Sequence, residues 1–170
     1  EVSYMSYIVI AAITGSVLSR IFWGDFPAFK VIPFAMESYW ELSIYLLLGI
    51  SAGLLSIVFV RFLFSIDGLF SRSPVPDWLT PALGGAVLGC LALVLPQVLG
   101  VGYETVNAAL ADNLTLKMAV ILLAAKLVAT AVCIGSGMSG GIFAPSLFLG
   151  AALGTAVGFG AEAVWPEFAG

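Results

Sequence analysis

The sequence of 170 residues has no histidine and few charged side chains: six basic and ten acidic residues make up 9% of it and give a net charge of −4. Without histidine, the commonest general base and metal ligand is missing. The HExxH motif of zinc metalloproteases is missing too. We therefore expect no catalytic residue, no metal site and no enzymatic activity. Because the basic residues form no cluster, nucleic acid is not an expected partner.

The shortage of charge also indicates which solvent surrounds the protein. Soluble domains carry about 25% charged residues, whereas here 61% of residues are apolar and 19 more are glycine. Disorder requires low hydrophobicity, so it is excluded as well. What remains is an integral, multi-pass membrane protein in contact with the lipid bilayer, and the cell membrane is the expected location. Cys90 and Cys133 lie in apolar runs without CxxC spacing, which predicts buried small hydrophobes rather than a disulfide or metal ligands.

Long uncharged runs predict the membrane helices. A helix needs about 20 apolar residues to cross roughly 30 Å of hydrocarbon, and the longest run, 35 residues, separates Lys126 from Glu162. We expect an all-α, polytopic membrane helix bundle, with residues 1–170 belonging to one membrane transport domain. Its apolar helices are expected near residues 5–23, 41–66, 78–99, 115–134 and 144–165.

Tryptophan, proline and glycine refine this helix bundle. All four tryptophans fall at segment ends, where indole rings favour the lipid–water interface: Trp23, Trp40, Trp78 and Trp165. Pro81 and Pro96 predict a kinked or broken third segment. Glycines four residues apart predict close helix packing: Gly49/Gly53, Gly85/Gly89, Gly150/Gly154 and Gly154/Gly158. These features favour a bundle with broken or tilted helices over a single-span anchor.

The stretch from Gly135 to Gly150 is rich in glycine and lies inside the longest uncharged run. Irregular backbone at membrane depth is tolerated only where it is buried in protein or lines a water-filled cavity. Pro145 suits the first turn of a new helix, since proline lacks an N–H that would be unpaired there. The free amides of such a helix start form an anion site that needs no charged side chain.

Two other interpretations of these glycines were considered. Gly135, Gly137 and Gly140 match GxGxxG, and Glu162 lies near the distance expected for a ribose-binding acid. A dinucleotide site would need a short strand before the glycines, but the preceding run has the length and composition of a helix, so this site is disfavoured. The glycines could also serve helix packing only, which would make the protein a membrane structural or assembly subunit.

The residues from Gly140 to Gly154 closely resemble the GGIFAPSL signature of the CLC chloride channels and proton–chloride exchangers. The segment Gly100-Val-Gly-Tyr-Glu-Thr-Val106 resembles another CLC stretch. This resemblance covers essentially the whole chain, although residues 1–75 carry it weakly. It implies an inverted-repeat membrane fold, with the chain spanning the end of one repeat and the start of the next, in a voltage-gated channel or antiporter that is a homodimer.

The resemblance also implies a site. The main-chain amides of Ile142 and Phe143 would bind chloride, which is the transported ligand, and no cofactor is expected. Gly140 and Gly141 would let the backbone approach the ion. Ala144 and Pro145 would set the start of the helix.

Other family motifs are absent from the chain: the Gly-Ser-Gly-x-Pro filter, the GxEGP segment with its gating glutamate, and the later pore tyrosine. We therefore expect a fragment that supplies about one wall of a pore and needs the remainder of the same subunit. Whether that subunit is a channel or an exchanger stays open. For Lys126, inside an apolar segment, two roles stay open as well: attraction of anions, or snorkelling or contact with a helix end.

Overall fold

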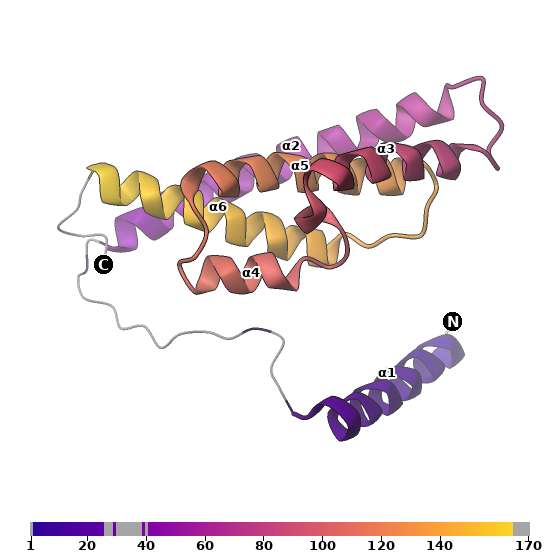
Figure 1. Ribbon diagram of the computed structural model, residues 1–170, viewed down its shortest axis with the longest axis horizontal. Coiled ribbons are helices and arrows are strands. Elements are labelled where there is room, and N and C mark those ends of the chain that lie inside the picture. Colours follow the sequence, from indigo (N-terminus) through magenta and orange to yellow (C-terminus); the bar gives the residue numbers. More distant parts are fainter. Residues whose placement is uncertain (1, 26–28, 30–38, 40, 165–170) are drawn as a thin grey trace. The chain divides into compact units, whose positions relative to one another are not determined.

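The structure is a computed structural model that describes residues 2–25, 29, 39 and 41–164. This described part is helical and contains no strand (Figure 1). The helices are α1 (Val2–Trp23), α2 (Glu41–Ser71), α3 (Thr80–Val94), α4 (Tyr103–Leu110), α5 (Leu116–Gly135) and α6 (Phe143–Val164), with a 3₁₀ turn η1 (Pro96–Val98). The all-α prediction is confirmed. Of the four tryptophans, Trp40 and Trp165 lie outside the described residues.

The chain forms two compact units, residues 1–30 and 31–170. The first contains α1, in which every side chain from residue 5 to residue 23 is exposed. Helix α1 ends at Trp23, and Gly24 follows in the left-handed region with φ 88°. Arg20 Nε lies 3.3 Å from Asp25 Oδ1 beside this end. The assignment of residues 1–170 to one transport domain stays a prediction.

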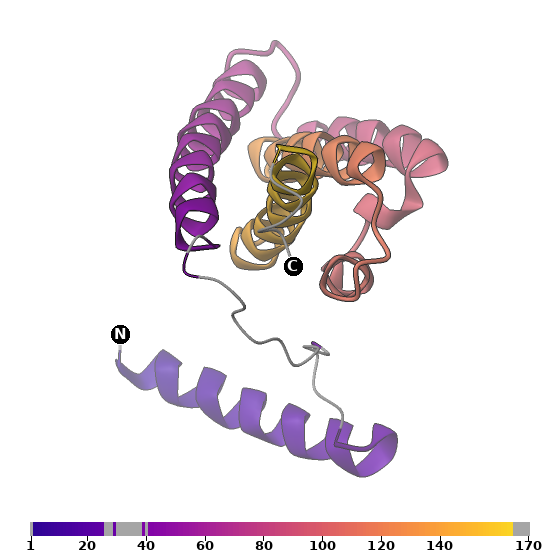
Figure 2. The same ribbon diagram turned by 90° about the vertical axis from the view of Figure 1, so that its left-hand side faces the viewer.

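Helix α5 is the centre of the second unit. It packs against α2, α3, η1 and α6, and in Figure 2 α2 lies on one side of α5 and α6 while α3 and α4 lie on the other. Ten of its 20 residues are buried, five of them alanine or glycine, so neighbouring helices approach its backbone closely. Phe59 of α2, Leu127 of α5 and Leu149 of α6 form a buried hydrophobic cluster. This cluster joins the three helices.

Four described helices are long and apolar enough to cross a membrane: Met5–Trp23, Glu41–Ser71, Leu116–Gly135 and Phe143–Val164. The segment expected near residues 78–99 is divided instead. Its 15-residue helix α3 rises only about 23 Å, at 1.5 Å per residue, and ends before Pro96, where η1 begins. Pro81 lies in the first turn of α3, where proline is tolerated, so it starts this helix rather than kinking it.

Helix α4 has no counterpart in the sequence-based expectation. It has eight residues, far fewer than a membrane span, so a search for long uncharged runs passes over it. Thr105 and Val106 on one face are buried, while Glu104 is exposed. A short amphipathic helix of this kind is visible only through its 3.6-residue periodicity.

The glycine pairs do not pack as expected. At Gly49, Gly53, Gly85, Gly89, Gly150, Gly154 and Gly158, an added Cβ would meet no heavy atom of the described chain within 4 Å. The close approaches occur at glycines outside those pairs. A Cβ on Gly84 would overlap the Ser136 side chain, and one on Gly135 would lie 2.9 Å from the Asp67 amide nitrogen. Among the described residues, the close helix contacts therefore occur at glycines that the four-residue spacing did not indicate.

Substitution of Gly135 tests the contact between α2 and α5. Gly135→Ala places a Cβ against the α2 backbone at Ile66 and Asp67, and overpacking of this kind costs about 1–3 kcal/mol of folding free energy. The matched control is Gly53→Ala in α2, where the Cβ meets open space and alanine favours the helix by roughly 0.5–1 kcal/mol. Thermal unfolding of the detergent-solubilised protein should show a lower Tm for Gly135→Ala only. Equal Tm values for the two variants would contradict this packing.

Candidate functional site

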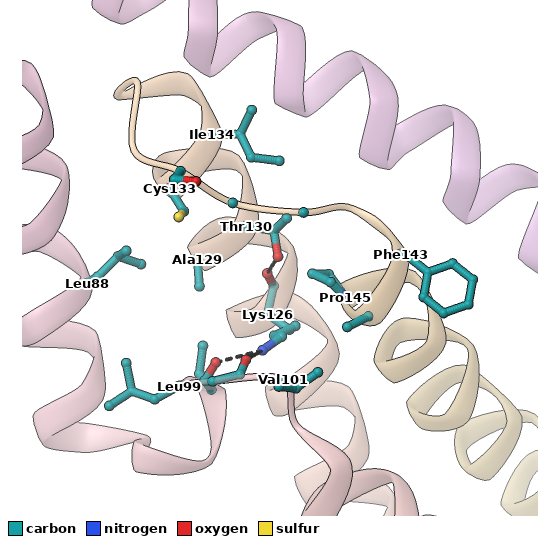
Figure 3. Close-up of a pocket in the computed structure, with 16 residues that line it drawn as sticks. Leu88, Leu99, Val101, Lys126, Ala129, Thr130, Cys133, Ile134, Phe143 and Pro145 are labelled. Atoms are coloured by element: carbon teal, nitrogen blue, oxygen red, sulfur yellow. Dashed lines mark hydrogen bonds between the residues drawn. The ribbon is translucent and has the colours of Figure 1, made fainter. Parts of the chain in front are cut away.

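A cavity of about 560 Å³ lies beside α5 in the second unit (Figure 3). Three segments line it together with α5: Leu88 of α3, residues 98–101 from the end of η1 toward α4, and the glycine-rich segment that leads into α6. Its lining is mostly apolar and contains no acidic residue: Leu88, Val98, Leu99, Gly100, Val101, Lys126, Ala129, Thr130, Cys133, Ile134, Ser139, Gly140, Gly141, Phe143, Ala144 and Pro145.

A compact turn after α5 directs the chain back toward this cavity. The amide of Gly137 donates to Ile134 O at 3.0 Å, the amide of Met138 donates to Cys133 O at 3.2 Å, and Gly137 adopts φ 81°. Ser136 is 1% exposed and its hydroxyl donates to Cys133 O. Ser136 also packs against Gly84 of α3, so a contact with α3 stabilises the turn in addition to its own hydrogen bonds. The helix break predicted in the longest uncharged run is therefore a turn that hydrogen bonds stabilise.

Helix α6 begins at Phe143 directly after this segment, one residue before the expected start. The Ser146 amide and hydroxyl donate to Ile142 O at 3.0 and 2.7 Å, which closes the first turn around Pro145. Amides in the first turn of a helix have no intrahelical acceptor, and no described residue accepts a hydrogen bond from the Ile142 or Phe143 amide. These amides lie at the positive end of the helix dipole.

The structure brings most of the predicted site residues to the cavity wall. Gly140, Gly141, Phe143, Ala144 and Pro145 line it, whereas Ile142 does not. The side chains of Ile142 and Phe143 are 57% and 84% exposed, and in Figure 3 the Phe143 ring points away from the other labelled side chains. Main-chain atoms rather than these two side chains are therefore what the segment offers to a ligand. The role of these residues in binding stays a prediction.

Lys126 lines the same cavity and is 3% exposed. Its ammonium donates to Val98 O at 2.8 Å and to Gly100 O at 2.7 Å, shown as dashed lines in Figure 3. The ammonium also lies 5.1 Å from the centroid of the Phe148 ring. Lys126 thus contacts the end of η1 and is buried rather than extended into solvent. Sequence reasoning missed these acceptors because they lie 28 and 26 residues away along the chain.

Gly102 brings the η1–α4 connection close to α6. It adopts φ 83°, and a Cβ there would overlap the Phe148 ring, which is 1% exposed. Gly100, two residues earlier, has φ 63° but open space around it. The two glycines therefore differ in structural role. Both permit left-handed backbone, but only Gly102 also permits close approach to Phe148.

The two cysteines are free thiols. Cys133 is half-buried at the cavity wall, whereas Cys90 is exposed on α3. The expectation that both are buried is wrong for Cys90, because no described element covers its face of α3. Among the described residues no cluster of three or more His, Cys, Asp or Glu side chains suits a metal ion.

The fold and the cavity together define a class. Apolar helices of spanning length, one of them beginning at a broken segment with free amides beside a cavity, are typical of membrane channels and transporters. The family model for voltage-gated chloride channels matches residues 1–169. The chain belongs to this family and is an integral membrane protein with several spanning helices.

Relatives named as channels and as exchangers both resemble the chain. It is 40% identical over 162 residues to chloride channel protein CLC-e of Arabidopsis thaliana, covering 90% of this chain and 23% of that protein. It is 36% identical over 159 residues to a putative chloride channel protein, ClcB-like, of Ralstonia nicotianae, covering 94% and 37%. It is 33% identical over 165 residues to the H(+)/Cl(-) exchange transporter ClcA of Yersinia pestis, covering 95% and 34%. The chain thus spans less than two fifths of the length of these relatives.

The pair Gly100 and Gly102 tests the wall of the cavity. Both Gly→Ala changes force alanine into the left-handed region at a cost of roughly 1–2 kcal/mol, but only Gly102→Ala also collides with Phe148. We expect the Tm to fall further for Gly102→Ala than for Gly100→Ala, and Phe148→Leu to restore part of the difference. Equal losses of Tm would show that Gly102 does not approach Phe148.

Proposed function

We propose that the protein takes part in chloride transport across a membrane, with the ion bound by the backbone amides of Ile142 and Phe143. The observation that carries this proposal is the start of α6 at Phe143, beside a cavity that the preceding glycine-rich segment lines. The names of the relatives supply the ion: they are chloride channels and a proton–chloride exchange transporter. The protein is then a transporter or channel with no enzymatic activity and no cofactor.

The proposed selectivity comes from replacing the hydration shell of the anion with fixed N–H dipoles. In a site lined largely by apolar side chains, these dipoles act in a low dielectric and favour negative charge. No acidic residue lines the cavity, so no carboxylate repels an anion there. In this proposal the ion contacts dipoles, because the Lys126 ammonium at the same cavity is bonded to Val98 O and Gly100 O, so binding stays weak enough for the ion to leave.

The glycines next to these amides fit the same role. A Cβ on Gly141 would meet nothing within 4 Å, so the backbone there is open to a ligand, and a Cβ on Gly140 would crowd Cys133 Sγ at 3.1 Å. Ala144 and Pro145 set the first turn of α6. The alternative, a structural subunit whose glycines serve packing only, is not favoured, because the glycine pairs of its helices meet no described neighbour.

The chain supplies one wall of the proposed pore, and the rest of the same subunit supplies the others. That subunit would act as a homodimer embedded in lipid. Relatives named as a channel and as an exchange transporter both match the chain, so the proposal covers both modes of transport.

A pair of substitutions at Phe143 separates the amide from the side chain. Phe143→Ala removes the ring and keeps the N–H, whereas Phe143→Pro removes both, at the first helical position where proline is well tolerated. A hydrogen bond to a charged group contributes about 1.5–3 kcal/mol, which corresponds to roughly 10–100-fold in affinity. In liposomes containing the full-length subunit, Phe143→Pro should raise the half-saturating chloride concentration by about that factor relative to Phe143→Ala.

Phe143→Ala is the control for the lost ring and should change flux far less than Phe143→Pro, with a similar Tm. If the two variants show the same half-saturating chloride concentration, the Phe143 amide does not bind the ion.

A further inference from the structure

Lys126 is a buried cation without a carboxylate partner. The ammonium lies in the interior of the second unit at 3% exposure, and no Asp or Glu of the described residues forms an ion pair with it. Burial of an ammonium is costly unless its protons are hydrogen-bonded. Two of its three donors are used on main-chain carbonyls, Val98 O and Gly100 O. The ammonium therefore interacts with the backbone of a single segment, the one that contains Val98 and Gly100.

That segment, residues 98–102, runs from the last residue of η1 to the residue before α4 and is called the η1–α4 connection. It contains two glycines with positive φ, Gly100 and Gly102. Carbonyls in such irregular backbone lack the hydrogen-bond ladder of a helix. Val98 is 4% exposed, so its carbonyl would be buried without a donor, whereas Gly100 is exposed and its carbonyl is only partly buried. The Lys126 ammonium supplies the missing donor from α5.

The same two carbonyls belong to residues that line the cavity. A carbonyl oxygen is the negative end of its dipole, so an unpaired carbonyl beside an anion cavity raises the energy of the anion. An ammonium bonded to that oxygen removes the repulsion and adds a positive charge behind it. This effect is independent of whether the ammonium touches the ion.

We infer that Lys126 is a positioning residue for the anion site: it fastens the 98–102 connection against α5 and masks two carbonyl oxygens that would otherwise oppose an anion. The inference rests on the proposed function for its second half only. The fastening holds the part of the cavity wall that residues 98–101 form, and the masking makes that wall compatible with negative charge.

Phe148 supports the fastening from α6. The centroid of its ring lies 5.1 Å from the ammonium. The ring also lies so close to Gly102 that a Cβ there would overlap it. Lys126 and Phe148 thus hold the connection from two helices, α5 and α6, at adjacent points. Thr130, one turn along α5, donates its hydroxyl to Lys126 O at 2.8 Å and faces the same cavity.

The fastening is tested without any anion. Hydrogen–deuterium exchange of the full-length subunit is measured in chloride-free buffer for the wild type, Lys126→Met and Lys117→Met. Met matches the length of the lysine stem without its charge, and Lys117 is an exposed lysine on the same helix. We expect the peptide covering residues 98–102 to exchange about tenfold faster in Lys126→Met only. Wild-type exchange in that variant would overturn the inference, because a direct ion ligand would leave the empty site unchanged.

The masking is tested with chloride. Lys126→Met should raise the half-saturating chloride concentration in liposome flux by about tenfold, more than it changes the maximal rate. Lys126→Arg keeps the charge and the donors, so it should restore the affinity to within about threefold. An unchanged chloride affinity in a Lys126→Met protein that folds, judged by its Tm, would overturn the masking.

If Lys126→Met does not fold, the exchange of residues 98–102 and the chloride affinity of Lys126→Arg test the inference instead. Slow exchange at residues 98–102 together with near wild-type affinity supports the inference, and fast exchange in a folded Lys126→Arg protein overturns it. Failure of the proposed function looks different: the wild type itself would then show no saturable chloride flux, whatever the exchange of residues 98–102.

Discussion

A main-chain amide inside a membrane has no water to bond, and this constraint shapes the chain from Gly135 to Phe143. Helices satisfy their own amides, so a break in an apolar run must be covered by protein or must face a cavity. Here it does both. The turn at Ser136 and Met138 is bonded back to α5 and covered by Gly84 of α3. Phe143, the first residue of α6, lines the cavity, and no described residue accepts a hydrogen bond from its amide.

Helix α5 makes this arrangement possible because small residues dominate its buried surface. Alanines let α2, α3 and α6 approach the helix closely, and the resulting contacts fix both ends of the break. Among the buried residues of α5, Lys126 is the one with a charged side chain. It crosses from α5 to the η1–α4 connection, so one side chain links the packing of the bundle to the wall of the cavity.

Much of this arrangement could be predicted from local sequence. Uncharged runs located α1, α2, α5 and α6, since the bilayer sets their length, and Pro96 indicated the break after α3. The rest depends on contacts between distant segments. Glycine spacing could not show that Gly84 and Gly135, rather than Gly85 and Gly89, touch a neighbour. Likewise, no local pattern pairs Lys126 with carbonyls more than 25 residues away.

The central claim is that main-chain amides at the start of α6 hold an anion. Crystals of the full-length subunit soaked in bromide, with data collected at the bromine absorption edge, test it most directly. The account predicts an anomalous peak within about 3.5 Å of the Ile142 and Phe143 nitrogens. Well-ordered backbone over residues 140–145 with bromide peaks only elsewhere would contradict it.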